Sequence, residues 1–201
     1  MLNNNFKKGL SAIDKHNFYT AINHFNNVIT KNILDEAAYL NRGIAFKYLN
    51  ENQNALKDFN NVIKLNNKNY EAYFYISEIY YYEYLSNTDN KDLLNLALDK
   101  NNYAITLNEK YYPAYELRSK IYFEMGEYKK SYEISKSLFD KKPKLSDSYK
   151  IMRESQNILI NEFDQKQSNK DYYISSIIIF LIMSIVIISS IIFVVNYWRW
   201  I

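Results

Sequence analysis

The 201-residue sequence has no cysteine and only three glycines, two prolines and two histidines. Without cysteine the chain forms no disulfide, and it offers no thiolate for catalysis or for binding zinc. The scarcity of glycine and proline indicates helices joined by short connections. The two histidines, His16 and His24, have no acidic residue at a recurring spacing typical of a metal site. We therefore expect no catalytic residue, no metal and no cofactor, and a protein that is not an enzyme and takes no small-molecule substrate.

One fixed spacing recurs in the first third of the chain, where small, aromatic and β-branched residues are matched in two successive units. A fixed period of this length is typical of helical repeat proteins, in which each repeat buries its apolar face only by stacking on a neighbour. The pairs that share this spacing are Gly9 and Gly43, Ala21 and Ala55, Phe25 and Phe59, Val28 and Val62, and Ile29 and Ile63.

Two further units follow with weaker matches. The third unit is longer, because about eight residues are inserted around 85–92, and its small residue is Ser77. The fourth unit has Ser119 at the equivalent position. Asn101 and Ser135 stand where the first two units have phenylalanine. A polar residue at an expected core position places the local packing of these two units in question.

This pattern resembles the tetratricopeptide repeat (TPR), which has a small residue in its first helix and an alanine and an aromatic residue in its second. The resemblance covers residues 2–145 and implies an all-α solenoid of about four helical hairpins. An amphipathic helix after the last repeat is typical of the cap that ends a solenoid. The boundaries expected on this basis are 2–35, 36–69, 70–111 and 112–145 for the repeats and 146–165 for the capping helix.

Residues 174–195 are 22 consecutive residues without a charge. At about 1.5 Å per residue, a helix of this length spans about 33 Å, enough to cross a hydrocarbon core of about 30 Å. A buried core helix is the alternative, but a helix apolar on every face is rare in a small soluble domain. We predict a linker at 166–171 and a transmembrane helix at 172–198 that contacts lipid. With no apolar run of a signal peptide at the start, we expect a tail-anchored, single-pass membrane protein with a cytoplasmic N-terminal domain.

Basic and acidic residues balance over residues 1–126, and basic residues exceed acidic ones over 127–153. A nucleic-acid-binding protein concentrates basic residues on one face, so the balance over most of the chain argues against such a partner. Near an anionic membrane, the basic segment would contact lipid headgroups, although the interleaved acidic residues are as typical of a solvated face. The predicted membrane-proximal basic patch consists of Lys129, Lys130, Lys136, Lys141, Lys142 and Lys144.

The resemblance implies a concave groove lined by the first helix of each repeat, in which proteins of this family bind peptides or partner helices. The leading hypothesis is a membrane-tethered adaptor or scaffold, and the alternative is a fixed assembly subunit of a larger membrane complex. The inward positions are mostly aromatic and aliphatic, which favours an apolar peptide or an amphipathic helix as the protein partner. These positions are Phe6, Leu10, Leu40, Asn41, Ile44, Tyr48, Phe74, Tyr75, Tyr81, Tyr82 and Phe123.

Chaperone-binding relatives hold a carboxylate with lysine, arginine and asparagine in this groove. Of the matching positions here only Asn41 keeps its residue type, and Glu71 would repel an anion. Burying a carboxylate beside Glu71 without a cationic partner is unfavourable. A second interpretation of the aromatic positions remains open, because such rings on helices often turn inward and fill the core.

Overall fold

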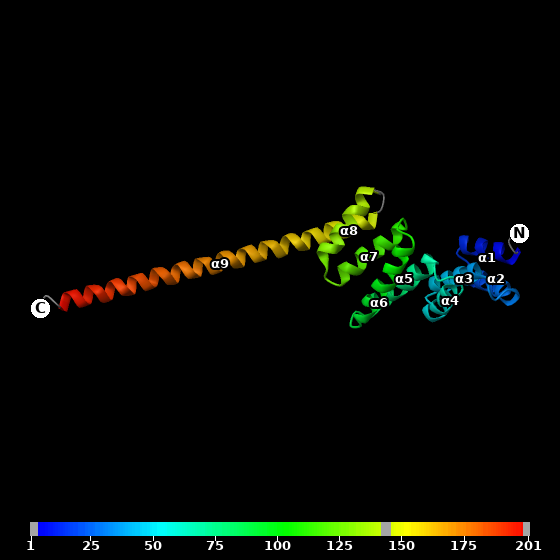
Figure 1. Ribbon diagram of the computed structural model, residues 1–201, viewed down its shortest axis with the longest axis horizontal. Helices are drawn as coiled ribbons and strands as arrows, with labels where there is room; N and C mark the ends of the chain where they lie inside the picture. The colour runs from blue at the N-terminus through cyan, green and yellow to red at the C-terminus, as the bar shows by residue number, and fades with distance from the viewer. Residues whose placement is uncertain (1–3, 142–145, 199–201) are drawn as a thin grey trace. The chain divides into compact units, whose positions relative to one another are not determined.

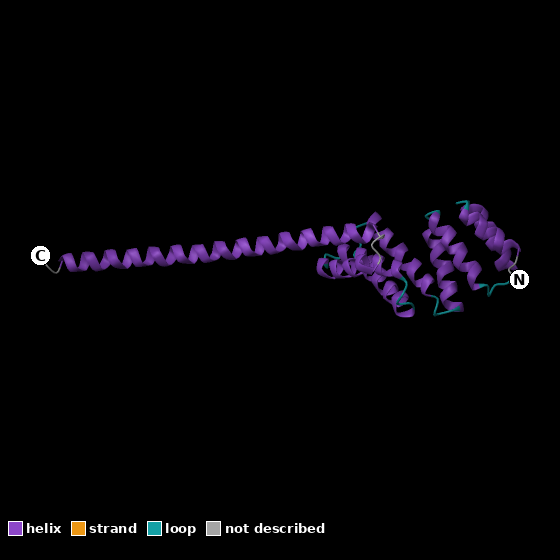
Figure 2. Cartoon of the chain, turned by 90° about the horizontal axis from the view of Figure 1, so that it is seen from above, coloured by secondary structure: helices purple, strands orange, loops and turns teal. Residues whose placement is uncertain are grey.

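The computed structural model describes the backbone of residues 4–141 and 146–198, and the side chains of 4–141 and 147–181. The described residues form helices and short connections, without a strand (Figures 1 and 2). The chain divides into a compact unit, Met1–Ser155, and a second unit, Gln156–Ile201. The helices are α1 (Asn4–Asp14), α2 (Phe18–Lys31), α3 (Glu36–Tyr48), α4 (Asn52–Leu65), α5 (Tyr70–Ser86), α6 (Asp92–Leu107), α7 (Tyr112–Glu124), α8 (Tyr128–Lys141) and α9 (Ser146–Trp198).

The first eight helices pack in consecutive pairs, α1 with α2, α3 with α4, α5 with α6 and α7 with α8. The second helix of each pair also packs against the first helix of the next pair, so the pairs stack in chain order (Figure 1). Three groups of buried apolar side chains fill the unit, and partly buried rings such as Tyr39 and Tyr75 contact more than one group. No pair buries its apolar face without its neighbours, which is the behaviour expected of a solenoid.

Asparagine and aspartate side chains begin and end the helices at repeating positions. Asn17, Asp35 and Asn69 each accept a hydrogen bond from the backbone N–H three residues later, which satisfies a donor at the start of α2, α3 and α5. At the ends of α2, α4 and α6, an asparagine accepts a hydrogen bond from the N–H two residues later. These residues are Asn32, Asn66 and Asn108.

In each of the first two helix pairs, a phenylalanine ring of the second helix packs against a glycine of the first helix. A Cβ atom built on Gly9 would lie 2.7 Å from the ring of Phe25, and one on Gly43 would lie 2.8 Å from the ring of Phe59. Both rings are completely buried. The absence of a side chain at these glycines is therefore what lets the two helices of each pair approach.

In the third and fourth pairs, the first helix carries a small polar residue at the position of the glycine. Ser77 in α5 and Ser119 in α7 are fully buried, and their hydroxyls donate to the backbone carbonyls of Ala97 at 2.7 Å and Glu116 at 2.8 Å. The residues at the phenylalanine positions, Asn101 and Ser135, are also fully buried. Among the described residues, the Asn101 amide and the Ser135 hydroxyl have no hydrogen-bond partner.

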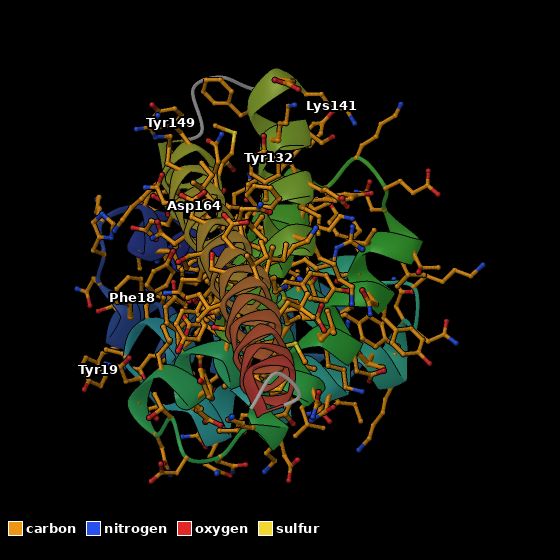
Figure 3. The ribbon with its side chains drawn as sticks, turned by 90° about the vertical axis from the view of Figure 1, so that its left-hand side faces the viewer. Phe18, Tyr19, Tyr132, Lys141, Tyr149 and Asp164 are labelled. Atoms are coloured by element: carbon orange, nitrogen blue, oxygen red, sulfur yellow. The ribbon has the colours of Figure 1, made fainter. Side chains whose placement is uncertain are left out.

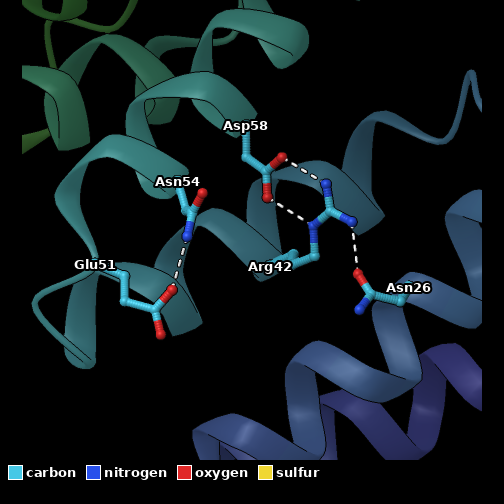
Figure 4. Close-up of polar contacts among 5 residues, drawn as sticks. All are labelled: Asn26, Arg42, Glu51, Asn54 and Asp58. Carbon is cyan, nitrogen blue, oxygen red and sulfur yellow. Dashed lines mark hydrogen bonds and ion pairs between the residues drawn. The ribbon is translucent and has the colours of Figure 1, made fainter.

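Arg42 in α3 connects three helices (Figure 4). Its Nε and Nη2 donate to the two carboxylate oxygens of Asp58 in α4, both at 2.7 Å, and its Nη1 donates to Asn26 Oδ1 in α2 at 2.6 Å. The Asp58 carboxylate is almost completely buried. A buried charge requires a partner of opposite sign, and the planar guanidinium supplies one with matched geometry.

The prediction of a single-pass membrane protein with a cytoplasmic N-terminal domain is wrong on the present structure. Within the described residues, no helix combines the length and the apolarity needed to cross a membrane. The described side chains of α9 are charged at intervals up to Asp171, and their uncharged apolar stretch from Ile174 to Leu181 spans only about 12 Å. The remainder of the predicted anchor, from residue 182, lies outside the described side chains. The predicted linker at 166–171 is helical and belongs to α9.

We expect Gly43→Ala to lower the free energy of unfolding. Overpacking a filled core costs about 1–3 kcal/mol, whereas alanine gains about 1 kcal/mol over glycine inside a helix. The Phe59 ring is completely buried and stacks on Tyr75, so we expect the packing cost to prevail in urea unfolding. In a Phe59→Leu background the same substitution should be neutral or stabilising. A stabilising effect of Gly43→Ala in the wild-type background would contradict this account.

We expect Arg42→Met to lower the free energy of unfolding by about 3–5 kcal/mol, because it leaves the Asp58 carboxylate buried without a counter-charge. Asp58→Asn should cost less, since the guanidinium of Arg42 is partly exposed to water and an amide oxygen still accepts a hydrogen bond. Thermal or urea unfolding of both variants tests this order. Equal losses, or a larger loss for Asp58→Asn, would show that the carboxylate is not the costly group.

Candidate functional site

Three of the aromatic residues predicted to line the groove lie in the core. Phe6 packs edge-on against Phe25, with ring centroids 5.6 Å apart. Phe74 packs in the same way against Tyr111, and Tyr81 is buried to the same degree. These three rings therefore fill the core and do not line the groove, in agreement with the second interpretation of the aromatic positions.

The other predicted groove residues are partly or largely accessible. Leu10, Leu40, Asn41, Ile44, Tyr75 and Phe123 are half-buried. The amide of Asn41 donates to the carbonyl of Ala37, and the ring of Tyr75 stacks on Phe59 with centroids 5.3 Å apart. Tyr48 and Tyr82 are the accessible rings of the set, with 58% and 51% of their surface exposed.

Tyr82 lies where three hollows of the compact unit meet. A hollow of about 660 Å³ is lined by Tyr48 and Tyr82 together with residues of α3 and α5. Two smaller hollows, of about 130 and 280 Å³, also include Tyr82 and continue over α7 to the first turns of α9. We call this continuous strip the groove and define it by Lys47, Tyr48, Glu78, Tyr82, Glu116, Lys120, Phe123 and Glu124.

The charged residues that line the three hollows are mainly acidic, six against three basic. Lys47 forms an ion pair with Glu78, and its ammonium lies 5.2 Å from the ring centroids of Tyr48 and Tyr75. Glu124 has no ion pair among the described residues, and burial raises the pKa of its carboxyl. The groove therefore presents accessible rings within a field of negative sign.

Lys120 lies between two carboxylates in the groove. Its ammonium is 2.8 Å from Asp147 at the start of α9 and 3.4 Å from Glu116 one turn earlier in α7. Burial alone would lower the pKa of Lys120, but the hydrogen bond to Asp147 and the charge of Glu116 outweigh it and raise the pKa. Lys120 also holds the pKa of Asp147 below its ordinary value.

Burial also raises the pKa values of three tyrosines in the core of the compact unit, Tyr75, Tyr81 and Tyr111. The effect is large for Tyr75 and Tyr81, and nearby carboxylates add to it. Burial and the charge of Glu71 raise the pKa of Tyr111 to about 12. These phenols stay neutral throughout the physiological range, so the charge of the groove comes from its carboxylates and lysines.

The structure places His16, one of the two histidines, in a turn between helices. His16 adopts a left-handed backbone conformation, with φ of 55°, in the turn after α1, and Asn50 and Gly126 do the same in the turns after α3 and α7. His16 is therefore a turn residue at a repeating position. In the part of the chain that the structure describes, no group of three or more histidine, aspartate or glutamate side chains could hold a metal ion.

The described lysines of the predicted basic patch, Lys129, Lys130, Lys136 and Lys141, are exposed on α8. Lys130 pairs with Glu127 at 3.3 Å, and Lys136 lies over the ring of Tyr132 (Figure 3 labels Tyr132 and Lys141). Lys142 and Lys144 lie outside the described residues. Contact of this patch with lipid headgroups therefore stays a prediction.

No family model matches the chain, and the comparison with characterised proteins gives no match. Solved structures match it well. A thermophilic TPR protein from Thermus thermophilus, TTC0263, aligns with a TM-score of 0.64 at 20% identity, over 78% of this chain and 81% of that one. The fold is that of TPR proteins.

Two further structures agree with this assignment. A TPR protein from Parabacteroides merdae aligns with a TM-score of 0.58 at 17% identity, over 80% of this chain and 66% of that one. The protein MamA aligns with a TM-score of 0.63 at 21% identity, over 76% of this chain and 79% of that one. At these identities the likeness concerns the fold alone.

We expect Asp147→Asn to remove a pH-dependent part of the stability. Because Lys120 lowers the pKa of Asp147 in the folded state, their pairing stabilises the fold above the unfolded pKa near 3.8 and is lost as the pH falls through the lower folded pKa. The Asp147 side chain is 57% exposed, so the effect at pH 6 should stay below about 1 kcal/mol.

The free energies of unfolding of wild type and Asp147→Asn, measured between pH 2 and pH 6, should therefore become equal at the acidic end of this range. Asp164→Asn, in the exposed part of α9 (Figure 3), is the matched control and should leave the pH profile unchanged. A constant difference between Asp147→Asn and wild type across this range would contradict the role of the pair.

Proposed function

We propose that the chain is a non-enzymatic scaffold that binds an amphipathic helix of a partner protein in the groove. The observation that supports this proposal is the pair of exposed rings, Tyr48 and Tyr82, that line a hollow of about 660 Å³. Large rings that lose little conformational freedom on binding are common anchors at protein interfaces. The TPR fold positions them on successive first helices, which is where a partner segment would lie across the stack.

The charge of the groove further defines the partner. Six acidic residues against three basic ones favour a segment that carries lysine or arginine beside its apolar face. An acidic segment would place carboxylates next to Glu124, whose charged form is already disfavoured by burial. We therefore propose a cationic amphipathic helix, with apolar residues at i, i+3, i+4 and i+7 against the rings.

The proposal is tested with a labelled peptide of about fifteen residues, with leucines at these spacings and lysines beside them, in a fluorescence anisotropy titration of the full chain. Tyr82→Ala should weaken binding by about tenfold or more, because truncating a central aromatic anchor costs about 2 kcal/mol. The matched control is Tyr103→Ala, because Tyr103 is similarly exposed, at 53%, but lies on α6 outside the groove.

A peptide with glutamates in place of the lysines should bind more weakly, and added salt should reduce the difference between the two peptides. Equal binding of both peptides would contradict the proposed partner chemistry. Equal losses for Tyr82→Ala and Tyr103→Ala would contradict the proposed site. If neither peptide binds, the chain does not take helical segments in this groove, and a fixed assembly subunit becomes the better account.

A further inference from the structure

A second arginine occupies the repeat position of Arg42 but lacks its acidic partner. The step along the sequence from Arg42 in α3 to Arg118 in α7 equals the step from Tyr39 to Tyr115. Both arginines lie over these tyrosine rings, with the guanidinium carbon 5.4 Å from the centroid of Tyr39 and 4.9 Å from that of Tyr115. The same two side chains thus adopt the same relation in the second and the fourth repeat.

The difference lies in the second helix of the repeat. Arg42 binds the carboxylate of Asp58 through Nε and Nη2, but the same step along the sequence from Asp58 leads to Ile134. Correspondingly, the Nε atom of Arg118 is buried and has no hydrogen-bond partner among the described residues. A buried donor without an acceptor is costly, and a donor on a charged group is more so.

Arg118 lines a hollow of about 440 Å³ between α7, α8 and the connection that precedes α7. Lys110 and Lys141 also line this hollow, and Ile134 and Leu138 provide apolar wall. Two exposed carboxylates, Glu109 and Glu133, complete the charged lining and would disfavour a polyanion. The space therefore suits one carboxylate together with an apolar neighbour.

We propose that this hollow binds a carboxylate of a partner protein, which takes the place that Asp58 fills in the second repeat. The guanidinium is planar and presents Nε and Nη2 as a fork that matches the two oxygens of a carboxylate. The ring of Tyr115 packs against the guanidinium, with its centroid 4.9 Å from the guanidinium carbon. The carboxylate comes from an aspartate or glutamate side chain or from a chain terminus, and the two sources share this chemistry.

The site is separate from the groove. Arg118 and Lys120 are two positions apart in α7, which places them about 200° apart around the helix axis. Arg118 lines the hollow with α8, whereas Lys120 lies in the groove and pairs with Asp147. Binding at one site can therefore be lost while binding at the other remains.

The test measures binding of a labelled, acetylated and amidated five-residue peptide, with one glutamate flanked by leucine and alanine, to the full chain. Two comparison peptides carry glutamine in place of glutamate, one amidated and one with a free terminal carboxylate. The glutamate peptide should bind about tenfold or more tightly than the amidated glutamine peptide, as expected for a hydrogen bond to a charged group. If the free-terminus peptide shows this preference instead, the ligand is a chain terminus.

Two substitutions locate the site. Arg118→Gln should abolish the preference for the carboxylate, and Ile134→Asp should abolish it as well, by supplying a carboxylate from within the chain. Ile134→Asn has the size of the aspartate without its charge and should retain the preference. Circular dichroism verifies that each variant is folded. If Arg118→Gln does not fold, the comparison of Ile134→Asp with Ile134→Asn still tests whether the carboxylate binds in this hollow.

Equal binding of glutamate and amidated glutamine peptides, with no preference for the free terminus, would overturn the proposal. So would an unchanged preference in Arg118→Gln or in Ile134→Asp, or its loss in Ile134→Asn. Tyr82→Ala should leave the preference intact. Its failure to do so would assign carboxylate binding to the groove rather than to the Arg118 hollow.

Discussion

The contact between the two helices of each pair constrains the rest of the structure. A residue with little or no side chain in the first helix faces one residue of the second helix, and the size of this pair sets how closely the helices approach. In the first two pairs the contact is glycine against a completely buried phenylalanine. This close approach holds each pair together as the unit that stacks in chain order.

The last two pairs use small polar residues at the same contact, and their energetics differ. The hydroxyls of Ser77 and Ser119 donate hydrogen bonds to backbone carbonyls, but the amide of Asn101 is buried without a hydrogen-bond partner in the described structure. An unsatisfied buried amide destabilises a fold by about 1–3 kcal/mol. The two proposed binding regions extend over these pairs, so a ligand bound there would stabilise the part of the fold that contains the unsatisfied amide.

Much of the fold could be predicted from the sequence, because the fixed spacing that links Gly9 to Gly43 reports the stacking of like units. The burial of Phe6, Phe74 and Tyr81 could not be predicted, since a first-helix position does not determine which way a large ring turns. The Arg42–Asp58 pair was missed because single charged residues on helices are usually solvated. Asn32, Asn66 and Asn108 recur at equivalent repeat positions, and this recurrence could have predicted where α2, α4 and α6 end. The predicted membrane anchor rested on residues whose side chains lie mostly beyond those described.

The most direct measurement of the central claim, that the groove binds the partner, is photo-crosslinking of the full chain with the cationic amphipathic peptide carrying a photoreactive residue on its apolar face. Mass spectrometry then identifies the residues of the chain that the peptide contacts. The account predicts crosslinks on α3, α5 and α7 around Tyr48, Tyr82 and Phe123. Crosslinks concentrated at exposed rings outside the groove, such as Tyr103 on α6 or Tyr19 on α2, which points outward in Figure 3, would contradict it.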